Sequence, residues 1–182
     1  MPESQTRQAG EPRLVLPERI EVAGAAAMRE LGRRLAGVLV AGDLVVLSGP
    51  LGAGKTTLVQ GIGAGLGVRG PITSPTFVIA RVHQPTGGGP ALVHADAYRL
   101  GSWAEVDDLD LDADMGAAVT VVEWGEGLVE GLAPDHLLIR IAWLDPGAAG
   151  DPADDEPRLV SLEGFGDRWG NPGWLSGLTL PC

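Results

Sequence analysis

The sequence predicts an α/β fold, a three-layer domain around a central sheet that is mixed and mostly parallel. Two observations support this fold class. A short apolar run at 43–48 leads through a glycine-rich loop into residues 57–66, which can only continue as a helix. Further short apolar runs follow at 91–96, 117–123 and 136–142, each bounded by glycine-rich or polar segments, as expected for buried strands of one sheet.

The composition indicates one acidic domain. The 182 residues include 13 Lys and Arg against 24 Asp and Glu, a formal net charge of −11 at pH 7. Bulk binding to nucleic acid requires a basic surface, so any RNA involved would be held by another protein. The lone cysteine, Cys182, excludes an intramolecular disulfide and fits a reducing compartment. No stretch approaches the roughly 20 apolar residues that span a bilayer, and the first residues do not form a signal peptide. We therefore expect a cytoplasmic protein with no membrane partner.

Three regions are expected along the chain. Residues 1–12 are polar and contain two prolines, which is typical of a disordered lead-in. Residues 13–163 form the domain, interrupted by a low-complexity acidic loop at 145–157 that we expect to be flexible. Residues 164–182 form a tail containing two tryptophans, to which the sequence assigns no function.

The elements around the central motif have simpler signals. Short strands are expected at 13–16 and 19–22, followed by an amphipathic helix at 24–40. Residues 77–82 pair with the strand at 91–96 as a β-hairpin, because a Gly/Pro-rich loop joins the two apolar runs. A last strand is expected at 158–162.

Glycines are unusually frequent in and just after the helix at 57–66. Each interior glycine costs up to about 1 kcal/mol relative to alanine. Tertiary packing must therefore hold this helix, and we expect the glycines to permit a close approach to the sheet. They are Gly61, Gly63, Gly65 and Gly67.

The loop that precedes this helix matches the phosphate-binding pattern G-x-x-x-x-G-K-[ST], from Gly49 to Thr56. Glycines allow the backbone N–H groups to line a concavity facing a polyanion, and the following helix adds the positive end of its dipole. Lys55 supplies a mobile positive charge, and the Thr56 hydroxyl is a hard oxygen ligand for magnesium. The residues predicted to bind the nucleotide are Gly49, Leu51, Gly52, Ala53, Gly54, Lys55, Thr56 and Thr57.

Two acidic residues close predicted strands. In a doubly wound sheet the carboxyl ends of the strands gather at the ligand crevice. At this position Glu123 is a candidate for holding magnesium directly or through water. The alternative is that Glu123 only faces solvent at the end of its strand. Asp96 is a candidate for orienting the attacking water or a metal-bound water, with a structural role as the alternative. His94 is interpreted as a core or rim residue rather than a base.

Two further segments have a predicted role. Residues 71–77 contain two prolines and three hydroxyl side chains, and they follow the loop by one helix, where nucleotide-sensing switch segments commonly lie. Residues 102–115 contain six carboxylates. The spacing of an EF-hand and its glycine are absent, which favours a solvated or partner-facing surface over a metal site.

Four motifs in this order and spacing resemble the TsaE (YjeE) family, the ATPase component of bacterial tRNA threonylcarbamoyladenosine synthesis. They are Gly49-Pro-Leu-Gly-Ala-Gly-Lys-Thr-Thr57, Ser74-Pro-Thr-Phe77, His94-Ala-Asp-Ala-Tyr-Arg-Leu100 and Val122-Glu-Trp-Gly125. The resemblance covers roughly residues 20 to 162. It implies a P-loop NTPase-like domain that binds ATP and Mg²⁺ and hydrolyses ATP slowly by itself.

The resemblance also implies partners and residue roles. The domain would act with two proteins that share a sugar-kinase-like fold, one of them the transferase. Together they modify the adenosine beside the anticodon in tRNAs that read codons beginning with A, and tRNA reaches this chain only through the complex. By matching position, Lys55 and the loop hold phosphates, Thr56 and Glu123 hold magnesium, and Asp96 is catalytic. Ser74 and Thr76 fall in the switch-like segment, and Trp124 lies beside the magnesium-binding acid.

Two other functions remain open from the residues alone. A small-molecule or nucleoside kinase built on the same loop would need a lid bearing arginines, but only Arg99 lies between Arg81 and Arg140. A nucleotide-gated binding module that hardly turns over is the third possibility, because carboxylates at strand ends indicate a capacity for metal binding but give no rate.

Overall fold

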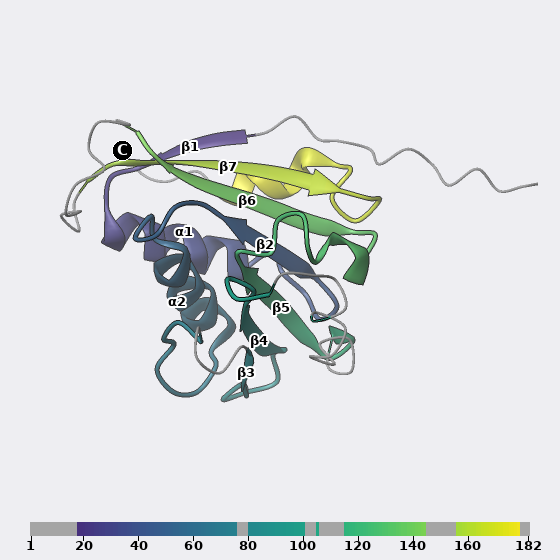
Figure 1. Cartoon of the computed structure of the whole chain (residues 1–182). Coiled ribbons are helices and arrows are strands. Elements are labelled where there is room, and N and C mark those ends of the chain that lie inside the picture. Colours follow the sequence, from purple (N-terminus) through teal and green to yellow (C-terminus); the bar gives the residue numbers. More distant parts are fainter. Residues whose placement is uncertain (1–17, 76–79, 101–104, 106–114, 145–155, 179–182) are drawn as a thin grey trace, which may run out of the picture.

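The computed structural model describes residues 18–75, 80–100, 105, 115–144 and 156–178. Within them, seven strands form one sheet, in the order β1-β7-β6-β2-β5-β4-β3 (Figure 1). The strands are β1 (Glu18–Val22), β2 (Leu44–Ser48), β3 (Ala80–His83), β4 (Ala91–Asp96), β5 (Ala118–Glu123), β6 (His136–Trp143) and β7 (Arg158–Phe165). The helices are α1 (Ala25–Ala36), α2 (Lys55–Leu66) and the 3₁₀ turns η1 (Glu130–Leu132) and η3 (Pro172–Leu178).

The sheet is mixed and mostly parallel, as the sequence predicts. Strand β2 pairs in parallel with both β5 and β6, and β5 pairs in parallel with β4. The remaining pairings, β1 with β7, β7 with β6 and β3 with β4, are antiparallel. Five strands therefore run in one direction and only β3 and β7 oppose them, so the carboxyl ends of β2, β4 and β5 lie together at one edge.

Layers of different thickness cover the two faces of the sheet. Helices α1 and α2 pack side by side against one face (Figure 1), where alternate residues of β2, β4 and β5 are buried with them. On the other face, the described cover is thinner and consists of loop residues and the η1 turn, packed on Val46, Val93 and Val122. The strands are apolar on both sides because both of their faces are buried.

Glycines allow α1 and α2 to approach each other very closely. A Cβ atom on Gly61 of α2 would lie 2.1 Å from the carbonyl oxygen of Arg29, and one on Gly32 of α1 would lie 2.4 Å from that of Leu58. A Cβ atom on Gly63 would lie 2.0 Å from Ile72 Cδ1 and 3.4 Å from Leu92 Cδ2 of β4, so its closest neighbour is the segment after α2 and the sheet comes second. The expected approach to the sheet is therefore wrong for Gly61 and Gly65, which permit a close contact between the two helices.

The chain after β7 packs on the helical side of the sheet. Strand β7 continues to Phe165, three residues beyond the predicted end at 162. Trp169 is fully buried in the same core cluster as α1 and α2, and Leu178 joins it. Arg168 donates two hydrogen bonds to the Asp43 carboxylate, at 3.1 Å each.

Several predictions concern residues outside those described. These are the lead-in at 1–12, the strand at 13–16, and most of the acidic stretch at 102–115 and of the loop at 145–157. The predicted strand at 19–22 corresponds to β1. The predicted hairpin is confirmed over residues 80–96 by the antiparallel pairing of β3 with β4, while its residues 77–79 lie outside those described.

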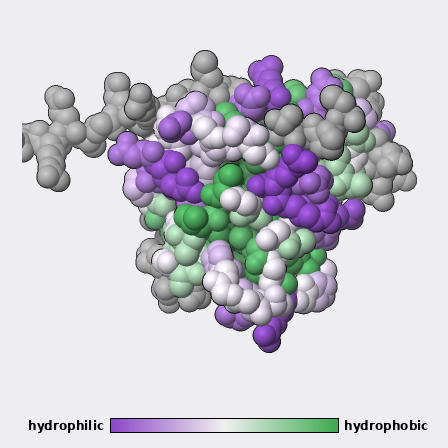
Figure 2. Space-filling model, turned by 180° about the vertical axis from the view of Figure 1, so that it is seen from behind, coloured by the Kyte–Doolittle hydropathy of each residue, from purple (hydrophilic) through white to green (hydrophobic). Residues whose placement is uncertain are grey.

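The described surface combines apolar and charged areas. Seen from behind the view of Figure 1, hydrophobic residues gather in the middle of the surface with hydrophilic residues around them (Figure 2). The most exposed large hydrophobic side chains are Leu51, at 87%, and Tyr98, at 63%. Among the described helices, none combines the length and the hydropathy required to cross a membrane.

Candidate nucleotide-binding site

The loop between β2 and α2 has the backbone that the glycine pattern predicts. Gly49, Gly52 and Gly54 have φ angles of 147°, 77° and 109°, in the region that side chains of L-residues rarely adopt. A Cβ atom on Gly49 would also lie 2.3 Å from the carbonyl oxygen of Ile141 in β6. Helix α2 begins at Lys55 without a side-chain cap, so the N–H groups of its first turn have no side-chain acceptor there. The loop and the helix start are thus built to bind an anion.

Lys55 is held by neutral groups of its own loop. Its Nζ donates hydrogen bonds to the carbonyl oxygens of Gly49, at 2.7 Å, and Pro50, at 2.9 Å. The same ammonium lies 3.8 Å from the centre of the Trp124 ring, in cation–π geometry. Burial lowers the pKa of Lys55, and the negative charges of Glu123 and Asp96 oppose that shift. The buried ammonium therefore has neutral partners that a phosphate would replace favourably.

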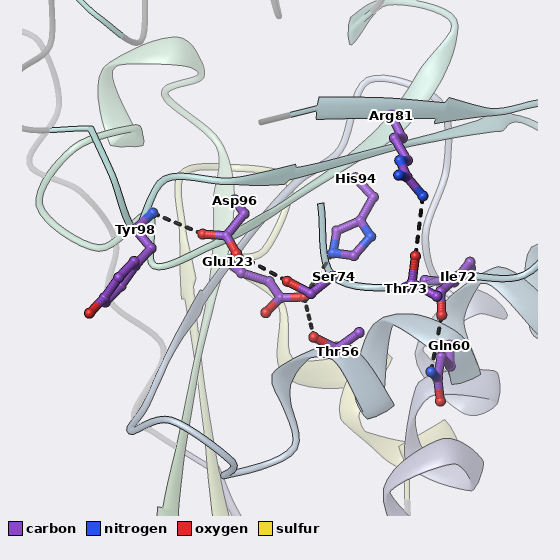
Figure 3. A network of polar contacts seen from close by, with 10 residues as sticks. All are labelled: Thr56, Gln60, Ile72, Thr73, Ser74, Arg81, His94, Asp96, Tyr98 and Glu123. Atoms are coloured by element: carbon purple, nitrogen blue, oxygen red, sulfur yellow. Dashed lines mark hydrogen bonds and ion pairs between the residues drawn. The ribbon is translucent and has the colours of Figure 1, made fainter. Parts of the chain in front are cut away.

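Two carboxylates meet where parallel strands end. Asp96 and Glu123 are direct neighbours in the register of β4 and β5 (Figure 3). Glu123 Oε1 accepts a hydrogen bond from the Thr56 hydroxyl at 2.8 Å, which joins the β5 end to the start of α2. Asp96 Oδ2 accepts a bond from Ser74 at 3.2 Å, and its Oδ1 accepts one from the Tyr98 N–H at 2.9 Å. Both predicted acids are therefore in the site.

His94 also contacts this group, a contact that the sequence interpretation did not assign. Its side chain has no exposed surface, and its Nε2 lies 2.8 Å from Glu123 Oε1. Since a carboxylate can only accept, we assign the proton to Nε2. A signal existed in the sequence: His94 and Asp96 are two residues apart on one strand, so their side chains share a face.

Trp124 is held in an unusual conformation directly after Glu123. Its φ of 60° is the only positive value among the described non-glycine residues. Its N–H donates to the Leu47 carbonyl oxygen at 2.8 Å, and its ring lies 5.1 Å from that of Tyr98. Left-handed backbone at a bulky residue costs free energy and persists only where surrounding contacts enforce it, commonly at functional sites.

These side chains surround one cavity of about 210 Å³. Lys55 is the only cationic residue among the described residues that line it, so the arginines expected for a kinase lid are not part of this lining. Gly49 and Ala53 support the loop without lining the cavity, and Thr76 lies outside the described residues. The lining consists of Leu51, Gly52, Gly54, Lys55, Thr56, Thr57, Ser74, Asp96, Glu123 and Trp124.

The donor set fits a nucleotide accompanied by Mg²⁺ better than a resident metal ion. The described residues hold no group of three or more His, Cys, Asp and Glu side chains arranged for a metal. Magnesium at phosphates is commonly held by one or two protein oxygens together with phosphate oxygens and waters. Thr56 and Glu123, whose oxygens lie 2.8 Å apart, supply such a pair.

Comparison with known proteins adds the family. The family model described as "Threonylcarbamoyl adenosine biosynthesis protein TsaE" matches residues 22–146. The chain belongs to the TsaE family. A relative from Streptomyces coelicolor, "tRNA threonylcarbamoyladenosine biosynthesis protein TsaE", is 63% identical over 143 residues, which cover 78% of this chain and 93% of the relative.

Two further comparisons agree with that membership. A protein of the same name from Mycobacterium tuberculosis is 58% identical over 118 residues, covering 61% of this chain and 70% of the relative. The fold matches the crystal structure of Bacillus subtilis YdiB with a TM-score of 0.67 at 24% identity, over 93% of this chain and 97% of that chain. At that identity, the second comparison supports the fold alone.

Proposed function

We propose that this chain is an ATP-binding and ATP-hydrolysing subunit that acts in the biosynthesis of threonylcarbamoyladenosine in tRNA. Membership of the TsaE family supports the pathway. One structural observation supports the chemistry: the phosphate-binding loop with Lys55, the Thr56–Glu123 pair and Asp96 all face the same cavity.

Each group has a specific role in this proposal. The loop N–H groups and Lys55 bind the phosphates, and Thr56 and Glu123 hold Mg²⁺, which neutralises charge on the phosphate oxygens. Asp96 accepts a hydrogen bond from the attacking water and so orients it. The water oxygen bonds to the γ-phosphorus while the bond to the β-phosphate oxygen breaks. The products are ADP, inorganic phosphate and a proton.

The segment before residue 76 links the nucleotide to the rest of the molecule. Ile72 is tied to α2, because Gln60 of that helix donates to its carbonyl oxygen at 3.0 Å. Ser74 then donates to Asp96 at the end of β4 (Figure 3). We propose that residues 71–77 act as a switch, with Ser74 and Thr76 reporting the occupancy of the phosphate site and Trp124 supporting Lys55.

The proposed partners are two proteins of sugar-kinase-like fold, one of them the transferase. tRNA would contact those proteins, and the modified base would be the adenosine next to the anticodon in tRNAs that read codons beginning with A. The net charge of −11 supports this division, since an acidic chain is poorly suited to hold RNA itself. The reaction would take place in the cytoplasm.

The deciding experiment measures steady-state ATP hydrolysis by this chain alone and with the two partner proteins. In parallel, threonylcarbamoyladenosine is quantified on tRNA over several turnovers. We expect slow hydrolysis that rises with the partners, and repeated modification only when both this chain and ATP are present. Unstimulated hydrolysis with no effect on tRNA modification would contradict the proposed function. Phosphate transfer to nucleosides or small molecules would then be screened.

A further inference from the structure

His94 occupies a position where an apolar side chain would be expected. It lies in β4 on the helix-covered face of the sheet, and neighbouring strand residues on that face, Leu92 and Val121, are fully buried and apolar. Its Nδ1 has no hydrogen-bond partner among the described residues. A buried polar ring that leaves one nitrogen unpartnered costs free energy that an aliphatic side chain would not. Packing alone therefore does not explain the histidine.

The imidazole has one described polar contact, and that contact is to the proposed magnesium-binding acid. His94 Nε2 and the Thr56 hydroxyl both donate to the same oxygen, Glu123 Oε1, at 2.8 Å each (Figure 3). One donor comes from β4 and the other from α2, so the carboxylate at the end of β5 is fixed from two sides.

His94 is not placed to react with a substrate. It is absent from the described lining of the cavity, whereas Glu123, Asp96 and Thr56 belong to it. Its ring is fully buried behind the carboxylate. Any effect of His94 on the site must therefore pass through Glu123.

We propose that His94 is a positioning residue, whose Nε2–H fixes the Glu123 carboxylate in the orientation that binds Mg²⁺. This inference rests on the proposed function, because it assigns the second donor to the acid that would hold the metal. Hydrogen-bond partners behind a metal-binding carboxylate restrict its rotation, and their removal typically costs about 10- to 100-fold in metal affinity or activity.

The test compares His94→Leu, which removes the donor, with His94→Gln, whose side-chain N–H₂ can reach a similar point. Isothermal titration measures ATP binding at graded free Mg²⁺ and again in EDTA. We expect His94→Leu to raise the Mg²⁺ concentration for half-maximal ATP affinity by about 10- to 100-fold and to leave affinity in EDTA within about twofold. His94→Gln should recover most of the loss. An equal loss in EDTA and in Mg²⁺ would indicate a general structural role and overturn the inference.

The matched control is His83→Leu. His83 is also a buried histidine of this hairpin with an unpartnered ring nitrogen, but its other ring nitrogen lies 3.4 Å from the Arg69 carbonyl oxygen instead of contacting Glu123. We expect it to leave the Mg²⁺ dependence of ATP binding unchanged. If His94→Leu behaves like His83→Leu while the unmodified chain shows Mg²⁺-dependent binding, the inference fails and the proposed function stands. If the unmodified chain shows no such dependence, the proposed function itself fails.

A double-mutant cycle guards against misfolding and indirect effects. In a Glu123→Ala background, His94→Gln and His94→Asn should differ little, because the carboxylate that they orient is gone. In the native background, His94→Asn, whose shorter side chain falls short of Glu123, should raise the Mg²⁺ concentration for half-maximal ATP affinity as His94→Leu does. Equal behaviour of the Gln and Asn variants in the native background would overturn the inference, even if His94→Leu does not fold.

Discussion

The two ends of β2 show how the same chemical group can serve different purposes. At the start of the strand, the Asp43 carboxylate is 5% exposed and accepts two hydrogen bonds from Arg168 and one from the Val40 N–H. At the other end, across the register of β2 and β5, the Glu123 carboxylate is 3% exposed and accepts from a hydroxyl and an imidazole. Both acids are buried, but among the described residues only Asp43 has a guanidinium partner.

The difference concerns how a buried charge is compensated. A carboxylate paired with a bidentate arginine has its negative charge compensated, so it attracts a further cation only weakly. A carboxylate held by a hydroxyl and an imidazole keeps most of its capacity to attract a cation. The paired end therefore indicates a structural role, and the end without an arginine indicates a binding site.

The largest expected effect comes from the same Asp-to-Asn substitution at the cavity, beside Glu123, that is made at Asp43 below. Asp96→Asn, at the carboxyl end of β4, should reduce ATP turnover by about 10²- to 10⁴-fold, because an amide orients the attacking water poorly. ATP affinity should remain within about threefold, and the thermal midpoint should not fall. Single-turnover hydrolysis and titration calorimetry measure the two quantities. A collapse of ATP binding would mean that Asp96 is structural.

The next effect concerns Lys55, which lines the same cavity as Glu123 and Asp96. Lys55→Ala should weaken ATP binding by about 10- to 100-fold, the value of a charge-assisted hydrogen bond to phosphate. Affinity for adenosine, which lacks phosphates, should stay the same. Because burial disfavours the ammonium, the variant should fold at least as well as the unmodified chain. Unchanged ATP affinity would contradict the assignment of the loop.

The matched substitution at the other end of β2 should affect stability instead. Asp43→Asn weakens the bonds to Arg168 and should lower the free energy of unfolding by about 1–3 kcal/mol. ATP affinity and turnover per folded molecule should be unchanged. Urea unfolding and ATP titration on the same preparation check stability and affinity. Loss of turnover without loss of stability would contradict the structural role of Asp43.

The sequence predicts one of these ends far better than the other. Glu123 and Asp96 follow apolar strands, and the loop has a spacing pattern, so local signals identify them. The Asp43–Arg168 pair joins residues 125 positions apart through a tail without periodicity, and no local signal can reveal it. His94 is intermediate: its position two residues before Asp96 gives the face, but its contact with Glu123 depends on the pairing of β4 with β5.

The smallest expected effect tests whether an arginine–carboxylate pair stabilises the fold by itself or only when the pair is buried. Arg140 of β6 donates to Glu126, just past Trp124, and to Glu163, so an arginine-paired carboxylate also exists near the loop end of the sheet. The side chains of Arg140 and Glu126 are 41% and 34% exposed, and solvent screening limits such a pair to less than about 1 kcal/mol. Arg140→Gln should therefore reduce stability slightly and leave ATP affinity within about twofold.

The pH dependence of that small effect has a definite sign. The hydrogen bond from Arg140, with a smaller contribution from Ser48, lowers the pKa of Glu126 below its ordinary value of 4.5. Because the folded-state pKa is depressed, the stabilisation is fully present above the unfolded-state pKa and is lost as pH falls through the folded-state value. Urea unfolding at neutral pH and well below pH 4.5 should show the difference between Arg140→Gln and the unmodified chain shrinking on acidification. A difference above about 2 kcal/mol at neutral pH would show that exposure does not weaken the pair, and burial would then not explain why Asp43 stabilises the fold.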